Sequence, residues 1–483
     1  MFIILLAVPP AAALACLKAP VRACQAVSIG AGLASFASVI ALVPAAARHD
    51  LTVGRYLRAD AVSVVFLLAT SFLYAAVAAY SVGYFRGEEG SAGFARYARR
   101  FYAGLNVFAW SMLAAPLLSS LALLWIAVEV TTVISALLVA IEDTDRAVEA
   151  AWKYVLIASA GLGLALLATI FMYAAGAHVL GQSYDLGFTG LMRAGPRLPH
   201  TAVRLAFGLA VLGFGTKVGL FPVHTWLPDA HAEAPTPVSA LLSGSLLAVS
   251  FYAILRYYQV SVTALGPRFP QAVLLAFGIA SLLLAALYLF GQRNLKRLLA
   301  YSSVEHMGIL AIGVSFGAPI ALAGVLLHVL AHAAAKGNAF MGAGVLVRKY
   351  HTKRIAAVGG GLDLLPWSGP LLLVAVLALS AMPPFGIFRS EFQIVAGGFA
   401  ASRNAAAAVL IVAVTVAFLG LSLSANRMLL APGTGRLPRG EPSAWMVVPV
   451  LAGVAVLVLL GVHPPADLAA LLARGAAELR GLA

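Results

Sequence analysis

The sequence predicts an all-α protein that crosses a lipid bilayer about fourteen times. Hydrophobic residues make up 62% of the 483 residues and charged residues only 10%, and the mean hydropathy is +0.96. Soluble domains are ordinarily about half apolar and a quarter charged. Apolar runs of about 18–25 residues also recur along the chain, and each is long enough to cross ~30 Å of hydrocarbon. Lipid is therefore the expected solvent for most of the chain.

The expected membrane helices follow one another along nearly the whole chain. They lie near residues 2–17, 25–46, 61–84, 102–119, 120–141, 151–175, 203–223, 238–258, 271–290, 303–317, 319–346, 367–388, 404–425 and 444–462. The longest segments between them, 176–202 and 426–443, are rich in Gly, Pro and Arg and too short for a soluble domain. The tail "ADLAALLARGAAELRGLA" predicts one amphipathic helix at the membrane surface.

The charges indicate how the chain is oriented. The opening "MFIILLAVPPAAALAC" lacks the basic segment of a secretory signal, so it is expected to be the first membrane helix. The net charge of +14 comes from basic residues in short loops, which indicates loop anchoring rather than nucleic-acid binding. With the basic runs at 96–100, 293–297 and 348–354 on the cytoplasmic side, both termini lie outside. We expect a multi-pass protein of the cell inner (plasma) membrane.

Two of the expected helices are interrupted by proline. "GTKVGLFPVHTWLPDAHAEAPTPVSALLSG" at 215–244 places Lys217 in an apolar run and then breaks the run at Pro222. "MPPFG", with Pro383 and Pro384, precedes Glu391 in the same way. An interrupted membrane helix is tolerated where the freed backbone groups line a polar cavity. The sequence therefore predicts that the seventh and twelfth helices are broken beside a polar site.

Eight titratable residues fall within the expected membrane helices or, for Glu391, directly after the break in the twelfth. They are Glu129, Lys153, Lys217, His306, His328, His332, Lys336 and Glu391. A charge at membrane depth costs at least ~2.5 kcal/mol, so such groups are normally paired, hydrated or functional. Any single member is explained by an ion pair or by a side chain reaching to the surface. The set, spread over successive helices, favours a proton relay, because burial and partners bring Lys and Glu towards neutrality and histidine titrates there already. Glu305 is either a further relay group or a helix-start residue.

The spacing of these groups predicts an internal repeat. Glu129 and His306 lie 177 residues apart, Lys153 and His328 lie 175 apart, and Lys217 and Glu391 lie 174 apart. The last pair also combines a titratable residue with a proline break in both halves. Interrupted helices at corresponding positions of two halves are typical of transporters built from repeats, with the transport site at the breaks.

Four segments resemble a known family: "KVGLFPVHTWLPDAHAEAPTPVSALLSG", "AYSSVEHMGILAIG", "LLHVLAHAAAKGNAFMGAG" and "PPFGIFRSEF". They look like the antiporter-like, proton-conducting membrane subunits. This family includes the M subunit of respiratory complex I, its relatives in membrane-bound hydrogenases and formate hydrogenlyase, and the D subunits of multi-protein sodium/proton antiporters. The segments are most similar to the F-type subunit of hydrogenase 4.

The resemblance implies a role for each relay residue. Glu129 and Lys217 would be the paired acid and base of a first half-channel, and Lys153 would join them to a central axis. That axis would consist of His328, His332 and Lys336, and Glu391 would exchange protons with the far side. Two inverted five-helix repeats would occupy 102–258 and 259–428, after three helices at 1–101 and before a last helix and tail at 429–483.

One position departs from the complex I relatives, which have a lysine on the eighth helix. This chain reads "GSLLAVSFY" there, with Ala248 at the lysine's place. Water can bridge such a gap if each molecule finds two to four polar partners. We therefore expect a water-filled gap lined by Ser243, Gly244 and Ser250.

Other motifs are assigned structural roles. His224, Asp229 and His231 lie in a loop interrupted by prolines, so they are expected to cap the break rather than to bind a metal. Asp60 is expected to stabilise a helix N-terminus. "GGG" at 359–361 lacks a nucleotide-binding pattern. Cys16 and Cys24 suit neither a disulfide framework nor zinc or iron–sulfur ligation. We expect no metal and no cofactor.

Two classes of function remain. The first is a proton-translocating subunit of a membrane-bound redox complex of the hydrogenase or NADH dehydrogenase type. It would have no redox centre of its own and would contact other membrane subunits and, through them, a peripheral redox module. The second is a coupling subunit outside redox enzymes, in a sodium/proton antiporter complex or in proton-driven inorganic carbon uptake. An independent transporter of organic solutes is disfavoured, because no polar cluster beyond the titratable row suggests a solute pocket.

Overall fold

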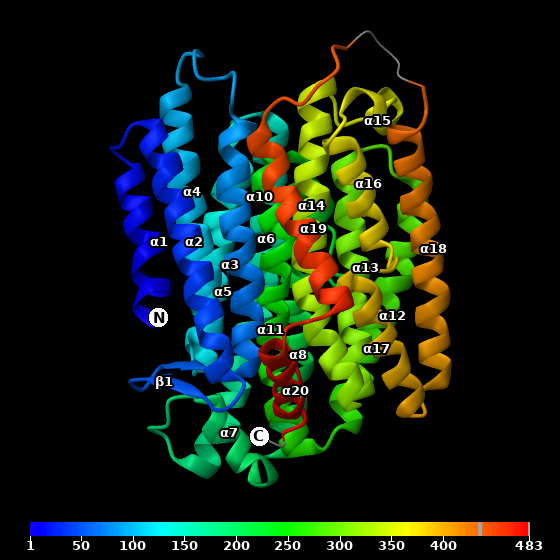
Figure 1. Ribbon diagram of the computed structural model, residues 1–483. Coiled ribbons are helices and arrows are strands. Elements are labelled where there is room, and N and C mark those ends of the chain that lie inside the picture. The colour runs from blue at the N-terminus through cyan, green and yellow to red at the C-terminus, as the bar shows by residue number, and fades with distance from the viewer. Residues whose placement is uncertain (433–436, 482–483) are drawn as a thin grey trace.

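The protein is a bundle of upright helices. A computed structural model describes residues 1–432 and 437–481, and Figure 1 shows the helices side by side with a small hairpin and α7 at the lower end. The first helices are α1 (Phe2–Cys16), α2 (Val21–Ala46), α3 (Ala61–Tyr84), α4 (Phe94–Ala114), α5 (Leu121–Val139), α6 (Asp145–Leu180), α7 (Phe188–Ala194) and α8 (His200–Val218). The hairpin pairs β1 (Leu51–Val53) with β2 (Leu57–Ala59) in antiparallel register.

The second part of the chain adds the central and peripheral helices. They are α9 (Leu227–Glu233), α10 (Thr236–Leu241), α11 (Leu247–Leu265), α12 (Arg268–Tyr288), α13 (Leu295–Phe316), α14 (Pro319–Tyr350), α15 (Gly361–Leu364), α16 (Ser368–Leu379), α17 (Gly386–Ala400), α18 (Asn404–Leu429), α19 (Ala444–Val462) and α20 (Ala466–Leu479). A π-helical turn, η4 (Leu242–Leu246), joins α10 to α11. The continuous segment from α10 to α11 is buried along most of its length, and so are helices α3, α13 and α14. These elements form the centre of the bundle.

Each expected membrane helix coincides with an observed helix or helix pair. Among the described residues, eleven helices are long and apolar enough to cross a membrane, and α1 and α16 are shorter apolar helices. The helix expected at 102–119 begins earlier, at Phe94, because the basic run at its start is helical too. The expected boundaries after residues 101 and 258 therefore fall inside α4 and α11. The count of fourteen and the inverted repeats stay predictions.

Both predicted helix breaks are present. Helix α8 ends at Gly219, which has a left-handed backbone (φ 82°), and Pro222 lies in the irregular segment before α9. Helix α16 ends at Leu379, and Pro383 and Pro384 lie in the segment before α17. Each break lies beside a buried titratable residue. Lys217 lies at the end of α8, just before the first break, and Glu391 lies in α17, just after the second.

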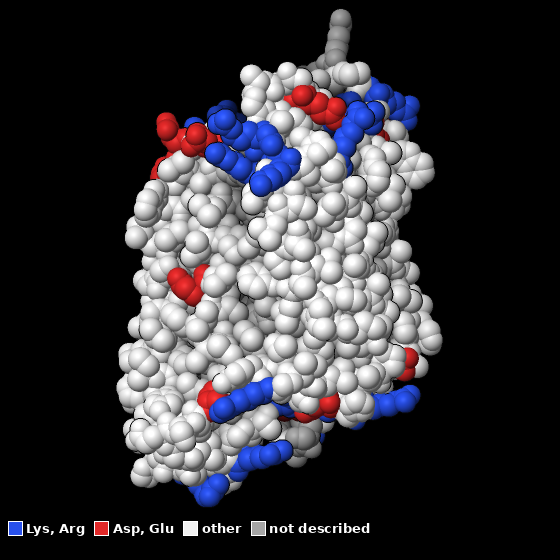
Figure 2. Space-filling model, turned by 90° about the vertical axis from the view of Figure 1, so that its left-hand side faces the viewer, with Lys and Arg blue, Asp and Glu red and all other residues white. Residues whose placement is uncertain are grey.

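Charges gather at the two ends of the bundle. Figure 2 shows Lys, Arg, Asp and Glu along an upper and a lower rim, with a largely uncharged band between them that one acidic patch interrupts at mid-height. The three basic runs share one end of the bundle. Arg348 pairs with Glu88, shortly before the run at 96–100 (2.5 Å), and Arg354 forms a β-bridge with Asn294 of the run at 293–297. Lys353 also pairs with Glu233 there (3.1 Å). An apolar band between two charged rims is the surface that a bilayer requires.

The predicted C-terminal helix is present as α20, but it does not lie free on a membrane surface. It packs against α2, α3, α11 and α14, and Figure 1 shows it at the lower end of the bundle, below α19. Part of the expected segment 426–443 lies outside the described residues, at 433–436.

Candidate functional site

The titratable residues of the second half face one another between two antiparallel helices. On α14, His328, His332 and Lys336 recur every four residues and so share one face. Helix α13 presents Glu305 and His306 to this face, and all five side chains are buried. Sequence spacing could predict the α14 stripe, but only the fold brings α13 against it.

Hydrogen bonds fix the protons on two of the histidines. The Ser390 hydroxyl donates to the carbonyl of Ile387 (2.8 Å), so its oxygen accepts a hydrogen bond from His328 Nδ1 (2.9 Å). Nε2 of His328 is then the acceptor for His306 Nδ1, at 3.1 Å. Because a neutral imidazole has one donor and one acceptor, the two rings form a directed hydrogen-bond chain. Such a chain is suited to passing a proton from ring to ring.

Glu391 lies beside this chain, next to His306. Its Oε1 atom is 4.0 Å from His306 Nδ1, and within the described chain that oxygen has no hydrogen-bond partner. The residue is only 7% exposed. It also lines a cavity of about 460 Å³, together with Met382, Phe392 and Thr415. Glu391 therefore connects the buried histidines with a cavity beside the break in α16–α17.

The same groups include a possible metal-binding triplet. His306, His328 and Glu391 offer ligand atoms that all lie within 4.8 Å of one another. Three helices contribute these residues, so spacing along the sequence could not predict the cluster. The hydrogen bond between the two rings already accounts for their approach, and the expectation that the chain binds no metal stays a prediction.

Lys336 marks the other end of the α14 stripe. Its ammonium group donates to the carbonyl of Leu299 on α13 (3.1 Å) and interacts electrostatically with Glu305. Glu305 lies well inside α13 and is 2% exposed, so it is not a helix-start residue. The structure thus assigns Glu305 to the buried row.

In the first half, Lys217 is buried at the end of α8 beside neutral partners. It donates to Thr132 Oγ1 and more weakly to the Val128 carbonyl (3.5 Å). Its ammonium nitrogen lies 5.4 Å from the centre of the Tyr154 ring, within range of a cation–π contact. A buried ammonium group held mainly by neutral groups can release its proton more readily than one in a tight ion pair.

Glu129 and Lys217, expected to be the paired acid and base of the first half-channel, form no direct ion pair, and their joint role stays a prediction. Glu129 instead accepts a hydrogen bond from Ser159 on α6 (3.4 Å). No ion pair within 4 Å joins Glu129 and Lys217 in the part of the chain that the structure describes. The two groups interact electrostatically over a longer distance. The reason is that Glu129 lies on a half-buried face of α5 and turns towards α6.

The expected burial of Lys153 is also wrong. Its side chain is 49% exposed and pairs with Glu149 (2.6 Å) and Asp229 (3.6 Å). Helix α6 begins at Asp145, so Lys153 lies near the charged end of the bundle, where a long side chain reaches solvent. Lys153 therefore does not join the first half to the central axis.

The region around Ala248 is packed rather than hollow where the gap was expected. A side-chain carbon on Gly244 would lie 2.5 Å from Leu73 and 3.1 Å from the carbonyl oxygen of Ala333. Ser250 bonds to the Leu246 carbonyl of its own helix (2.9 Å). A gap lined by Gly244 and Ser250 is therefore wrong. The π-helical turn instead directs Ser243 towards α13, where its hydroxyl lies 2.7 Å from that of Ser303.

Sequence reasoning missed two buried groups, Lys296 and His231. Lys296 belongs to the basic run "RNLKR", which reads as a solvated loop, yet it is 1% exposed. His231 was expected to cap the helix break, and its Nδ1 does donate to the Leu227 carbonyl (2.8 Å). Its Nε2, however, is buried and has no hydrogen-bond partner within the described ranges. For Lys296, the available signal of burial was its place in the first turn of the strongly apolar helix α13.

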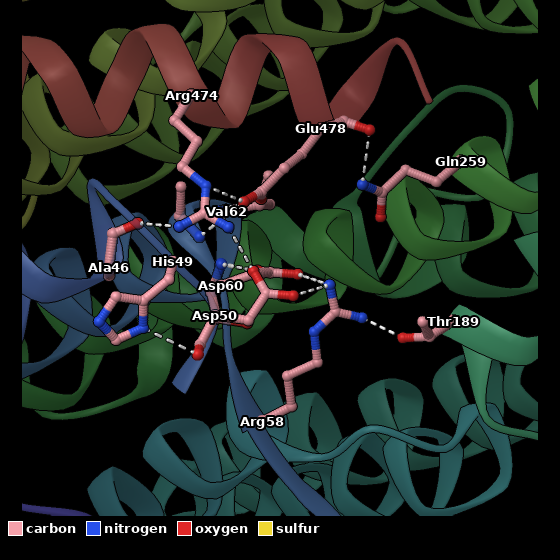
Figure 3. A network of polar contacts seen from close by, with 12 residues as sticks. Ala46, His49, Asp50, Arg58, Asp60, Val62, Thr189, Gln259, Arg474 and Glu478 are labelled. Carbon is pink, nitrogen blue, oxygen red and sulfur yellow. Dashed lines mark hydrogen bonds and ion pairs between the residues drawn. The ribbon is translucent and has the colours of Figure 1, made fainter. Parts of the chain in front are cut away.

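A separate ionic network closes the lower end of the bundle (Figure 3). Asp60 caps α3 by accepting from the Ser63 N–H (2.9 Å), as predicted, and pairs with Arg256 (2.6 Å). On α20, Glu478 accepts from the N–H groups of Ala61 and Val62 (3.1 Å each). Burial alone would raise the pKa of Asp60, but the Arg256 and Arg58 guanidinium groups hold it below its ordinary value. This network is structural and lies away from the titratable row.

Fold and site together define a polytopic helical membrane protein built around a buried row of titratable side chains. The chain belongs to the NADH:quinone oxidoreductase/Mrp antiporter transmembrane family, whose pattern matches residues 118–419. It is 34% identical over 418 residues to a hydrogenase-4 component F homolog of Methylacidiphilum infernorum, covering 85% of this chain and 86% of that protein. It is 32% identical to hydrogenase-4 component B of Escherichia coli, of which it spans 53%.

Solved structures share the fold. One is a chain of the Mrp complex from Dietzia sp., with a TM-score of 0.85 at 21% identity, over 99% of this chain and 97% of that chain. Another is a chain of respiratory complex I from Thermus thermophilus, also with a TM-score of 0.85 at 21% identity and with full coverage of both chains.

Proposed function

We propose that this chain is a proton-translocating, antiporter-like subunit of a membrane-bound redox complex of the hydrogenase or NADH dehydrogenase type. The observation on which this rests is the directed hydrogen-bond chain from His306 through His328 to Ser390, buried between three helices, with Glu391 4.0 Å from His306. The hydrogenase-4 component F homolog, matched over most of both chains, supports the redox assignment.

The relay would work by moving protons between buried groups. In the first half, Lys217 and Glu129 hold and release protons without a direct ion pair. In the second half, protons pass along Lys336, Glu305 and the three histidines to Glu391, which lies nearest to His306. The Ser243–Ser303 hydroxyl pair links the two halves. Each transfer needs only a proton acceptor within reach, directly or through one water.

The proposal also assigns partners, a cargo and an orientation in the membrane. The chain would contact other membrane subunits and, through them, a peripheral redox module that supplies the energy. Protons are the proposed cargo, and the membrane is the cell inner membrane with both termini outside. The charged rim with the three basic runs is then the cytoplasmic end.

A cation/proton antiporter complex is the second candidate. It is favoured by the likeness to the Mrp complex, whose TM-score equals that of complex I. Fold alone therefore does not separate the two. Sodium dependence does, because an antiporter needs the second cation and a redox-driven pump does not.

The test uses the full complex reconstituted into vesicles. Glu391→Gln removes the terminal proton acceptor at almost constant shape, and we expect proton translocation to fall by ~10-fold or more. Glu149→Gln is the matched control, since Glu149 is an exposed carboxylate on α6. Acidification driven by electron transfer is read with a pH-sensitive dye, with and without sodium. Unchanged translocation by Glu391→Gln would refute the relay, and a strict sodium requirement would favour the antiporter.

A further inference from the structure

Two polar cavities open at the end of the bundle that has the three basic runs. Their volumes are about 380 and 680 Å³, and both are lined by Arg146, Glu233 and Asn294. Across the larger cavity, Lys353 pairs with Glu233 at 3.1 Å. Most of the lining side chains are charged or polar, so both cavities are suited to holding water. The buried row described above ends at Lys336, which lines neither cavity.

Lys296 is buried two residues along the chain from Asn294, which lines both cavities. Asn294, a lining residue of both cavities, caps α13 through the Lys296 N–H (2.9 Å). The Lys296 ammonium group donates inward to the carbonyl of Ala234, the neighbour of Glu233. It also interacts electrostatically with Glu233, Glu142 and Lys353. One ammonium hydrogen is used by Ala234, which leaves two for water.

His231 lies on the route from Lys296 to Lys336. Both lysines are close enough to interact with its ring electrostatically. The ring is 5.6 Å from that of Phe340, which is one helical turn from Lys336 on α14. Since Nδ1 donates to Leu227, the lone pair is on Nε2, and that buried nitrogen has no partner among the described residues. An unpartnered buried nitrogen is costly unless water or a transient proton uses it.

We propose that Lys296 and His231 form the proton intake branch that joins the polar cavities to Lys336. This inference rests on the proposed function. The Lys296 ammonium group gives a proton through intervening water to His231 Nε2, and the imidazolium ion passes that proton on, again through water, to neutral Lys336. Water in the cavity then reprotonates Lys296. Nδ1 keeps its hydrogen bond to Leu227 throughout, so the ring needs neither rotation nor a change of tautomer.

A purely structural role makes a different prediction. If Lys296 only ties α13 to Ala234, any side chain with a charged donor would serve. Arginine keeps the charge and the hydrogen bond but does not give up its proton at neutral pH. The substitution Lys296→Arg therefore separates proton transfer from anchoring.

The experiment uses the full complex in vesicles, with Lys349→Met as the matched control. Lys349 lies at the same end and donates to the Gly440 carbonyl (2.8 Å), away from the branch. We expect Lys296→Arg to assemble and melt like the wild type while proton translocation falls by ~10-fold or more. We expect His231→Ala to lose translocation as well and to regain part of it when imidazole is added. Lys349→Met should translocate normally.

The outcomes are separable. If Lys296→Arg translocates normally while Lys296→Met does not, Lys296 is an anchor and the intake branch is overturned. Failure of imidazole to rescue a well-folded His231→Ala complex overturns the role of His231. If both branch variants translocate normally while Glu391→Gln does not, the intake lies elsewhere and the proposed function stands. If Glu391→Gln translocates normally too, the proposed function itself is wrong.

Discussion

At the scale of single residues, the direction of the hydrogen bonds matters more than the number of charges. Ser390 is neutral, yet it decides which nitrogen of His328 has the proton, because its own hydrogen is committed to Ile387. His328 can then accept from His306. A relay residue of this kind cannot be found by searching for titratable side chains.

Replacing Ser390 should therefore impair the relay without unfolding the chain. Ser390→Ala removes the acceptor for His328 Nδ1, at a cost in stability of about 1 kcal/mol. We expect proton translocation to fall several-fold and the melting temperature to change little. Ser315→Ala is the control, since Ser315 makes the same local bond to Ile312 (2.6 Å) on α13. Equal translocation by both variants would contradict the directed chain.

At the scale of elements, the sequence predicts much of the architecture. Apolar runs locate the helices, because every backbone group in lipid must be satisfied within a helix. Pro222 and Pro383 locate the breaks, because proline has no N–H group to give to a helical hydrogen bond. The burial of Lys153 and Lys296 was misjudged because both lie close to the charged end of the bundle, where position relative to the membrane boundary decides burial. The pairing of α13 with α14 could not be predicted, since apolar helices have similar patterns on every face.

The close packing at the break after α8 predicts that Gly219 cannot be replaced without loss of stability. Gly219 has φ 82°, and a side-chain carbon there would lie 2.4 Å from Leu227. Gly219→Ala should combine backbone strain with a clash and cost ~1–3 kcal/mol. Gly54→Ala measures the backbone strain alone, because Gly54 also has a positive φ (63°) but nothing lies within 4 Å of its added carbon. The difference between the two losses is then the cost of the clash with Leu227. Thermal unfolding in detergent measures both, and equal losses would show that α9 does not hold the break in place.

At the scale of the whole molecule, the two ends of the bundle differ in structure. One end has the two polar cavities, and the other is closed by ion pairs that join distant parts of the chain. Arg474 on α20 bonds Asp50 beside the hairpin (2.6 Å), and Asp60 at the start of α3 pairs with Arg256 on α11 (2.6 Å). The N-terminal and C-terminal parts are thereby tied together around α3.

This closure should depend on acid in a predictable way. The pKa of Asp60 is below its ordinary value in the folded chain, so ionised Asp60 stabilises the fold above the unfolded value of ~3.9. That contribution is lost as the pH falls through the folded pKa. Asp60→Asn leaves Arg256 as an unpaired buried charge and should cost ~3–5 kcal/mol at neutral pH.

Thermal unfolding between pH 7 and pH 3 measures this effect. The wild type should lose stability below about pH 4, whereas Asp60→Asn should be less stable at pH 7 and should lose less on acidification. Asp467→Asn is the control, because Asp467 is an exposed acidic residue in the first turn of α20. Parallel pH curves for the wild type and Asp60→Asn would show that closure of this end does not depend on the Asp60–Arg256 pair. A reduced pH dependence in Asp60→Asn but not in Asp467→Asn would establish that this one buried pair couples the start of α3 to α11.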